Sequence, residues 1–542
     1  MYDIIIKNGQ IVDGSGTSAY LGHIAVKDGK IAGIWPLGAI SEEALENQAG
    51  RVIDASGCQV TPGFIDNHSH SDDSVFTGSD SYNYLEQGVT TQIAGQCGDS
   101  PAPYYEGAFN SYKNRCSEEV INSMIEISRT PSSFMAAAEK QTFGTNYAFF
   151  VGHGSLHGKA MGYSGDRAST EQMACMKEML KDAMDAGFLG FTSGLVYAPS
   201  VYGDEEELSE LAKVMVPYNG IYASHIRGEG NNVLRAVKEA IAVGEKAGVE
   251  VLISHLKVMG LHNEGMSEKL LAEIDAANER GVIVNADQYP YVASSAPLLS
   301  QIPPKYLVDG HDAYMKRLAD PAIRKQMDWS IFNEVDEFES GIYSAGYNGA
   351  LVVGASKTPR YINKTIGQIA AEEGKEPIDA LCDLLLANDG SAQGVYFNQC
   401  PTDLLRIMRH PRVFCGSDWS DYPDYRYDPE KEGGGHPRAT ATTIRRLELV
   451  RDFRLRTMED SVKNLTYDTA KAMHLEGIGL LKEGYAADIC VCRYDRLHAS
   501  ADFAHPYREN EGIEYVLVNG AIAVEHGRCT KVRNGRILKR GQ

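Results

Sequence analysis

The chain has 542 residues, 43% of them hydrophobic, and a formal net charge of −21 with a sequence pI near 5.2. This length can bury the core of a large domain and an accessory one, while the acidic charge argues against a surface that follows nucleic-acid phosphates. No apolar run approaches the ~20 residues that span a bilayer, and the N-terminal residues do not resemble a secretory signal. We therefore expect neither a nucleic-acid nor a membrane partner.

The ten cysteines do not predict a disulfide framework in so long a chain. Most of them, among them Cys175, Cys382 and Cys415, fall within apolar segments and are expected to be buried thiols. A reducing cytoplasm is the expected setting for such a protein.

The two ends of the chain resemble each other and predict β-hairpins. Asn-Gly or Asp-Gly pairs lie inside short apolar segments, at residues 8–9, 28–29 and 519–520. Such pairs adopt the positive φ angles that tight hairpin turns need. We expect residues 1–56 and 476–542 to pack together as one small β-sandwich.

The central part, residues 57–475, alternates short apolar strands with segments of helical periodicity. Helices are expected at 170–186, 204–218, 231–247 and 267–280. This alternation is typical of an α/β protein with a parallel sheet, and we predict a (β/α)8 barrel of the TIM type. Between about 296 and 350 the alternation fails, so we expect an inserted subdomain there, on the catalytic face.

Five apolar, β-rich segments of this central part each stop on a side chain that can bind a metal. The segments and the side chains that follow them are 60–66 with His68 and His70, 89–95 with Cys97, 221–224 with His225, 249–254 with His255, and 413–417 with Asp418. In a parallel barrel the catalytic groups gather at the C-terminal strand ends, because the loops there do not build the core. The pattern predicts a metal centre in one mouth of the barrel and metal-assisted hydrolysis.

Each of these residues also has a purely structural interpretation. A His-x-His pair can be incidental, a cysteine is most often a buried thiol, and an aspartate at a strand end often caps a turn. For Cys97, the flanking Gly95 and Gly98 favour a ligand, since glycines let the backbone bend closely around one. For His225 and His255, two unrelated core histidines at matching strand ends are the less favoured interpretation.

Eight segments, in chain order, extend the pattern over nearly the whole chain. They are residues 62–70, 88–98, 194–197, 224–227, 254–257, 287–291, 416–418 and 436–438. Together these segments resemble those of the N-acyl-D-amino-acid deacylases, the D-aminoacylases of the amidohydrolase superfamily.

The resemblance implies a tightly bound Zn²⁺ held by Cys97, His225 and His255. It also implies a second, weaker metal position made by His68, His70 and Asp418. Imidazole and thiolate are ligands that suit zinc. Many related barrels bridge two metals with a carboxylated lysine, but no lysine ends the relevant strands here, so the Cys97 thiolate is expected to take that place.

Further roles follow from position and from the resemblance. Asp418 is the expected proton-transfer group, and Tyr197 resembles the tyrosine placed near the scissile carbonyl, although a lone tyrosine is more often packing. Lys257 lies at the same strand end as His255 and could hold a substrate carboxylate or be a solvated charge. By the resemblance, Tyr289 and Arg438 hold the substrate carboxylate. Arg227 and Asp287 lie beside candidate ligands and are expected to orient the imidazoles. For Arg438 the alternative is a loop salt bridge.

His153 ends another apolar run, and either an orienting or a structural role is possible. Three features depart from the family pattern: His157 stands where relatives commonly have arginine, Trp419 replaces a more usual glycine, and the loop from Asp418 to His436 is longer, with Asp421, Tyr422, Asp424, Tyr425, Arg426 and Tyr427 in it. All are expected around the pocket, so the preferred acyl group and side chain stay open.

The sequence thus predicts a zinc-dependent hydrolase that removes the acyl group from a small-molecule N-acyl amino acid, most often of the D series. One alternative is a cyclic-amide hydrolase of the hydantoinase or dihydroorotase type, which would normally show the bridging lysine. The other is a non-catalytic barrel scaffold, which would be expected to have lost ligands. Oligomeric state does not follow from the sequence.

Overall fold

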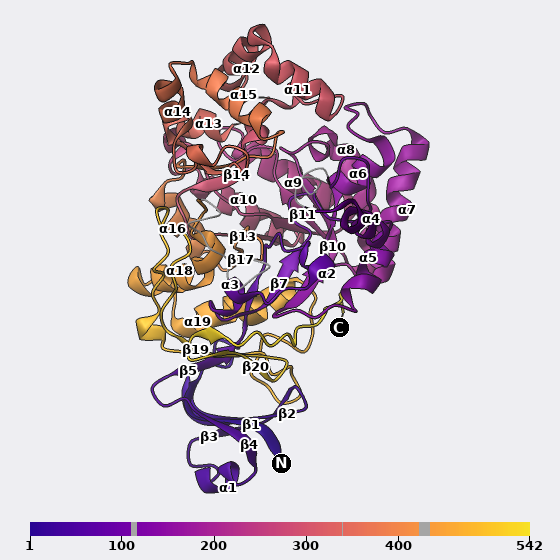
Figure 1. Ribbon diagram of the computed structural model, residues 1–542. Coiled ribbons are helices and arrows are strands. Elements are labelled where there is room, and N and C mark those ends of the chain that lie inside the picture. Colours follow the sequence, from indigo (N-terminus) through magenta and orange to yellow (C-terminus); the bar gives the residue numbers. More distant parts are fainter. Residues whose placement is uncertain (110–115, 336, 339, 422–433, 542) are drawn as a thin grey trace.

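The computed structural model describes residues 1–109, 116–335, 337–338, 340–421 and 434–541, and its centre is a closed barrel of parallel strands (Figure 1). Two hydrogen-bonded runs, β6-β7-β8 and β9-β10-β11-β12-β13-β17, form the wall. The Phe150 amide donates to the Ala94 carbonyl (2.9 Å) at one junction, and the Asn67 amide donates to the Cys415 carbonyl (2.8 Å) at the other. The strands are β6 (Phe64–Asp66), β7 (Val89–Ala94), β8 (Asn146–Phe149), which β9 (Val151–Gly152) continues, β10 (Gly190–Gly194), β11 (Ile221–His225), β12 (Glu250–Ile253), β13 (Val284–Gln288) and β17 (Val413–Cys415). The predicted α/β barrel is confirmed.

Helices cover the outside of the barrel where the periodicity predicts them. α7 (Thr170–Ala186) ends at Gly187, whose φ of 100° is the left-handed geometry of a helix C-cap. α8 (Glu205–Ala212) begins at Asp204, whose side chain accepts a hydrogen bond from the backbone of the first turn. The other helices around the barrel are α2 (Ser74–Thr77), α3 (Tyr82–Leu85), α4 (Glu118–Ile127), α5 (Pro131–Ala138), α6 (His153–Met161), α9 (Val233–Ala247), α10 (Ser267–Glu279), α16 (Pro401–Arg409), α18 (Arg438–Asp452), α19 (Met458–Lys463) and α20 (Thr469–Ala472).

Apolar side chains from the barrel strands fill its interior and leave the polar side chains to one mouth. Ile65, Ile93, Leu252 and Phe414 belong to one buried cluster inside the wall. A larger cluster lies between the wall and the surrounding helices. The barrel is therefore a packed core, and chemistry is confined to the loops at the C-terminal strand ends.

Both ends of the chain contribute to one nine-stranded sheet, which lies on the opposite side of the barrel from the insertion (Figure 1). Its strands are β1 (Tyr2–Ile11), β2 (Tyr20–Lys27), β3 (Lys30–Pro36), β4 (Ala49–Asp54), β5 (Gln59–Pro62), β18 (Ile489–Cys492), β19 (Ile513–Val518), β20 (Ala521–Glu525) and β21 (Arg528–Cys529), with α1 (Glu42–Glu46) beside β4. The sheet bends over itself, because Ile24 of β2 and Leu517 of β19 share one buried cluster.

Two of the three expected hairpins form, and the third is wrong. Residues 28–29 join β2 to β3, and residues 519–520 join β19 to β20. Asn8, with a φ of 61°, instead lies inside β1, where the pairing register with β2 shifts between Ile6 and Gly9. A side chain at Gly9 would come within 2.4 Å of the Val60 side chain. Asn8 and Gly9 therefore form a β-bulge, and the glycine leaves room for Val60 of the neighbouring strand β5.

The insertion continues beyond residue 350, where the sequence suggests its end. Its three-stranded antiparallel sheet joins β14 (Ser294–Pro297), β15 (Ala350–Gly354) and β16 (Gln393–Tyr396). The helices are α11 (His311–Ala319), α12 (Pro321–Asn333), α13 (Gly341–Ala345), α14 (Ile366–Glu373) and α15 (Pro377–Ala387). These elements share a separate apolar core. α14 and α15 have ordinary helical periodicity, so the sequence does not distinguish them from barrel helices.

The cysteines are all free thiols, and their burial differs in one case from expectation. Cys382 and Cys415 are buried, but Cys175 is exposed, because the helical period of α7 turns it towards solvent. Among the described residues, no helix is both long and apolar enough to cross a bilayer.

Candidate metal centre and active site

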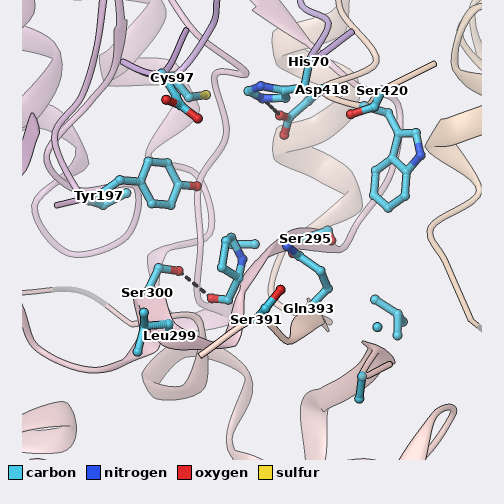
Figure 2. Close-up of a pocket in the computed structure, with 18 of the residues that line it drawn as sticks. His70, Cys97, Tyr197, Ser295, Leu299, Ser300, Ser391, Gln393, Asp418 and Ser420 are labelled. Atoms are coloured by element: carbon cyan, nitrogen blue, oxygen red, sulfur yellow. Dashed lines mark hydrogen bonds and ion pairs between the residues drawn. The ribbon is translucent and has the colours of Figure 1, made fainter. Parts of the chain in front are cut away.

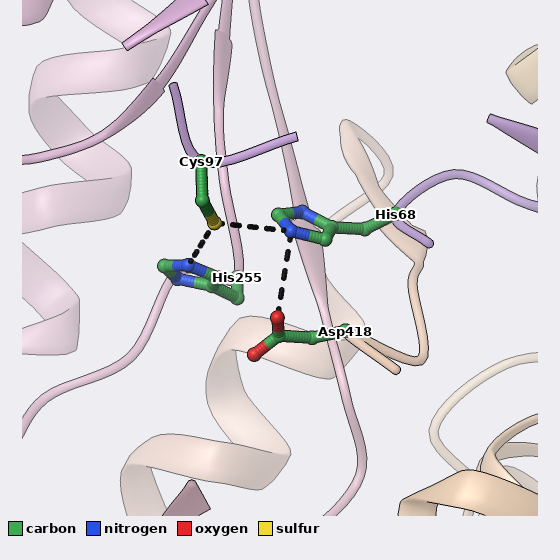
Figure 3. A group of neighbouring side chains, drawn as sticks. All are labelled: His68, Cys97, His255 and Asp418. Atoms are coloured by element: carbon green, nitrogen blue, oxygen red, sulfur yellow. Dashed lines mark hydrogen bonds and ion pairs between the residues drawn. The ribbon is translucent and has the colours of Figure 1, made fainter. Parts of the chain in front are cut away.

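The C-terminal ends of five barrel strands meet at one mouth and bring the candidate ligands together. Ligand atoms of His68, Cys97, His255 and Asp418 all lie within 4.8 Å of one another (Figure 3). A second group within the same limit consists of His225, Glu229 and His255. His255 belongs to both groups, so they form one continuous centre.

The Cys97 thiol lies between two imidazoles. Its Sγ is 3.4 Å from Nε2 of His68 and 3.3 Å from Nε2 of His255. Oδ1 of Asp418 lies 3.5 Å from the same nitrogen of His68 and 3.1 Å from Nε2 of His70. Sulfur, imidazole nitrogen and carboxylate oxygen are the ligand types of zinc sites, and here their atoms converge on one small space.

The far nitrogens of the same imidazoles contact carboxylates. Nδ1 of His68 lies 3.2 Å from Asp287, and Nδ1 of His255 lies 3.0 Å from Glu229. Asp287 also accepts the backbone N–H of His255 at 2.7 Å. A carboxylate behind each imidazole fixes the tautomer that leaves Nε2 free for an ion, as in many metal centres. The expected orienting role of Asp287 agrees with this geometry.

His225 lies beside His255 and has a ring nitrogen that could bind an ion. Its ring centroid is 4.3 Å from that of His255, and its Nε2 lies 3.7 Å from Glu229. The buried Nδ1 has no hydrogen-bond partner in the part of the chain that the structure describes. A buried ring nitrogen without a partner is costly unless it binds something, and an ion would satisfy it.

Backbone strain is concentrated at the candidate ligands. Cys97, His255 and Asp418 have φ angles of 54°, 37° and 53°, in the left-handed region that residues with a side chain rarely adopt. A side chain at Gly95 would meet the Phe150 carbonyl at 1.9 Å, and one at Gly98 would meet the Gly194 amide at 2.4 Å. The strand ends turn sharply, and this turning directs the ligand side chains into the mouth.

The charges of the centre support one another. Burial alone would raise the pKa of the Cys97 thiol, but the neighbouring imidazoles of His68 and His255 lower it well below its usual range. Burial likewise opposes ionisation of Asp418, yet the guanidinium of Arg438 and nearby imidazoles hold its pKa well below normal. Burial would lower the pKa of His70, whereas its hydrogen bonds with Asp418 and Cys97 raise it to about 10. Thiolate and carboxylate are therefore the favoured forms, as cation binding requires.

Glu229 was missed from the sequence. Its carboxylate is buried, forms an ion pair with Lys257, and contacts both His225 and His255. Burial would raise its pKa, but the Lys257 ammonium and the two imidazoles hold it far below the usual range. The only available signal was a carboxylate between two glycines just after the His225 strand, which is weak.

The residues expected to hold a substrate carboxylate lie in two different surroundings. Lys257 is buried, with its ammonium against Glu229 and 2.8 Å from Nδ1 of His255. Nη1 of Arg438 donates to Oδ2 of Asp418 at 2.7 Å. The Arg438 guanidinium lies 4.8 Å from the Tyr289 ring centroid. Arg438 lines the cavity described below, whereas Lys257 and Tyr289 are not among its lining residues.

The expectations for Arg227 and His157 are corrected, and of the two roles open to His153 the structural one is found. Arg227 pairs with Glu239 and donates to the carbonyls of Val201 and Gly203, so it holds the loop after β10 instead of an imidazole. His153 bonds to Glu207 at 2.8 Å, and His157 contacts the same carboxylate at 3.2 Å. These two histidines form a separate buried cluster with Glu207 behind the pocket wall.

A cavity of about 1640 Å³ opens in front of the centre. In Figure 2, Cys97, His70 and Asp418 lie on one side, and Leu299, Ser300, Ser391 and Gln393 of the insertion lie on the other, with Tyr197 projecting between them. The ring centroid of Tyr197 is 4.9 Å from that of His225. Trp419 lines the cavity, and Asp421 is bonded to Ser74, Gln92 and Tyr147. The other loop residues noted above, from Tyr422 to Tyr427, lie outside the described residues.

Comparison with known proteins shows the family to which the chain belongs. The model of the Amidohydrolase family matches residues 51–220 and 362–524. The chain is 31% identical to N-acyl-D-glutamate deacylase of Alcaligenes xylosoxydans xylosoxydans over 99% of this chain and 96% of that protein, and 29% identical to its D-aminoacylase over 99% and 98%. The solved structure of N-acyl-D-glutamate deacylase from Bordetella bronchiseptica, complexed with zinc and a phosphonate inhibitor, aligns with a TM-score of 0.79 at 29% identity over 99% of both chains. The chain belongs to the amidohydrolase family.

Proposed function

We propose that this chain hydrolyses the amide bond of N-acyl amino acids, most of all N-acyl-D-amino acids, to a carboxylate and a free amino acid. The observation that carries the proposal is the position of Asp418, whose carboxylate touches both the metal-ligand cluster and the open cavity. The full-length similarity to proteins named as deacylases of acyl-D-amino acids supports the substrate class.

Zinc is the metal that the donor set favours. Cys97, His225 and His255 would hold the tight ion, and His68, His70 and Asp418 a second, weaker one. When bound, zinc acts as a Lewis acid that polarises the amide carbonyl and makes water more acidic.

The side chains of the chain divide the remaining work. Asp418 accepts the proton of the attacking water and returns it to the leaving nitrogen. Arg438 keeps that carboxylate ionised and oriented through its 2.7 Å contact. Tyr197, which lines the cavity, donates a hydrogen bond from its hydroxyl to the oxygen that becomes negative as water adds.

The free carboxylate of the substrate needs a cationic partner. We assign this role to Arg438, helped by Lys257 and Tyr289. Arg438 lines the cavity, and the planar fork of a guanidinium can meet a carboxylate with two hydrogen bonds. Lys257 and Tyr289 would act from behind, since the Lys257 ammonium lies 5.6 Å from the Tyr289 ring centroid.

The free thiols support a reducing compartment such as the cytoplasm. We infer an accessory domain from residues 1–56 and 476–542 and a catalytic barrel from 57–475, whose insertion forms one wall of the pocket.

A paired substrate screen tests the proposal. Zinc-loaded protein is given matched D- and L-N-acyl amino acids, together with a hydantoin and dihydroorotate, and release of free amine or ring opening is followed. We expect amine release from the D series, and loss of it in Asp418→Asn. Turnover of the cyclic amides alone would favour the hydantoinase-type alternative. No turnover by a zinc-replete, folded protein would favour the scaffold.

A further inference from the structure

Trp419 lines the cavity directly after Asp418 in the chain. Its backbone carbonyl accepts the N–H of His70 and the hydroxyl of Tyr84, both at 2.7 Å. These contacts involve only the main chain of Trp419, so any residue at this position could make them. The large, partly buried indole therefore requires a separate explanation.

The indole lies beside the guanidinium of Arg438. The central carbon of the guanidinium is 5.3 Å from the Trp419 ring centroid and 4.8 Å from that of Tyr289. Tyr289 follows β13 and Trp419 follows β17, so the two rings come from the ends of neighbouring barrel strands. A guanidinium is attracted to the face of an aromatic ring, most strongly where water is excluded. The Arg438 side chain is 4% exposed, so solvent screens these contacts little.

The polar contacts of the guanidinium constrain the position of its terminal nitrogens more than the tilt of its plane. Nη1 donates to Oδ2 of Asp418 at 2.7 Å, and Nη2 donates to the carbonyl of Ser295 at 3.3 Å. To meet a carboxylate with two hydrogen bonds, however, a guanidinium must lie in the plane of that carboxylate. Contact with ring faces restricts the tilt and so prepares the fork for such a ligand.

We propose that Trp419 is a positioning residue, which holds the plane of Arg438 so that the guanidinium can meet the free carboxylate of the substrate with two hydrogen bonds. The inference rests on the proposed function, in which Arg438 is the cationic partner of that carboxylate. It assigns the indole to recognition of the carboxylate, and not to proton transfer or metal binding. Loss of the ring should therefore weaken substrates with a carboxylate selectively.

Variants that differ in having an aromatic face test this role. Trp419→Leu and Trp419→Met are compared with Trp419→Phe, as zinc-loaded full-length protein, on N-acetyl-D-norleucine and its carboxamide. We expect Trp419→Leu and Trp419→Met to raise KM for the acid by about 3- to 10-fold, within the range of one cation–π contact, with kcat changed by less than about twofold. KM for the carboxamide should hardly change. Trp419→Phe keeps a ring and should recover most of the affinity for the acid.

The matched control is Trp329→Leu, which removes an indole that is 58% exposed on α12 and should leave both constants as in wild type. Zinc content and melting temperature are measured on every preparation. Equal losses on acid and carboxamide would overturn the proposal, because the indole would then contact the substrate itself or support the fold. Loss of zinc in the Trp419 variants, or no recovery in Trp419→Phe, would overturn it as well.

Binding without turnover separates this inference from the proposed function. N-methylsulfonyl-D-norleucine and its carboxamide have no amide at the position of the scissile bond, and isothermal titration calorimetry gives their Kd values. If no N-acyl amino acid is hydrolysed, but the acid binds more tightly than its carboxamide and only variants without a ring at residue 419 lose this preference, the deacylase function fails and the role of Trp419 stands. If substrates are hydrolysed and Trp419→Leu keeps the wild-type preference for the acid, the function stands and the inference fails.

Discussion

The guanidinium of Arg438 and the carboxylate of Asp418 form a buried pair, with Nη1 and Oδ2 2.7 Å apart. The other oxygen of Asp418 faces His68 and His70, at 3.5 and 3.1 Å. One carboxylate thus joins the arginine to the metal donors. Arg438 therefore has a positioning task in addition to any contact with substrate, and the two tasks can be separated by experiment.

Replacing Arg438 by alanine is expected to lower kcat on every amide substrate, because Asp418 loses the partner that keeps it ionised. Substrates with a free α-carboxylate should lose about tenfold more in kcat/KM than their carboxamide analogues, since they also lose a charge-assisted contact. Steady-state kinetics on matched acid and amide pairs measures the difference. Equal losses would leave Arg438 with the positioning task alone.

Asp418→Asn is expected to keep zinc and lose turnover by about 10²- to 10⁴-fold, the usual value of general acid–base catalysis. The amide is nearly isosteric with the carboxylate but cannot take a proton from water. Its melting temperature should fall, because the buried Arg438 is left without a counter-charge. Zinc content, melting temperature and kcat are measured on one preparation. A zinc-replete variant with more than about a tenth of wild-type kcat would exclude Asp418 as the essential base.

Cys97→Ala is expected to purify with less than about 0.1 zinc per chain, against about one for wild type. The reason is that the Cys97 thiolate contacts the imidazoles of both His68 and His255. His225→Ala and His255→Ala should behave alike. The matched control is Cys175→Ala, an exposed thiol on α7 that should leave zinc unchanged. Elemental analysis decides, and full zinc in the Cys97 variant would make the assignment wrong.

Glu229→Gln is expected to weaken zinc binding by about 10- to 100-fold, the usual effect of losing a carboxylate behind a metal-binding imidazole. The neutral amide no longer balances the buried Lys257, and it holds Nδ1 of His255 less firmly. Competition against a chelator measures the affinity. Glu239→Gln, which removes the partner of Arg227 instead, serves as control and should bind zinc as wild type does.

The Glu207 cluster is expected to make stability depend on pH at the acid end. Burial opposes its ionisation, but hydrogen bonds from His153 and His157 lower the pKa of Glu207 from 4.5 to about 2. Because the folded pKa is depressed, its contribution is complete above about pH 4.5 and is lost as the pH falls towards 2, with an upper value of about 3 kcal/mol. Melting temperatures of wild type and Glu207→Gln should differ most at pH 7 and approach each other as the pH falls from about 4.5 towards 2. A difference that is constant over this range would contradict the assignment.

The barrel and the gathering of ligands were predictable because both depend on local patterns. Alternating strands and helices imply a parallel barrel, and a barrel superimposes the ends of its strands, so that His68, Cys97, His225, His255 and Asp418 had to meet. Gly95 and Gly98, on either side of Cys97, indicate the sharp turn at that strand end.

The fold class, the family resemblance and the shared mouth of the candidate ligands therefore follow from the amino-acid sequence alone. The partner that each polar group takes depends on how distant segments pack against one another. Asn8 makes a bulge because β2 pairs on both sides of it, Arg227 bonds to Glu239 instead of an imidazole, and Glu229 closes the centre behind His255. Such pairings depend on which side chains from distant segments come within bonding distance. Hydrophobic periodicity and strand spacing do not contain this information.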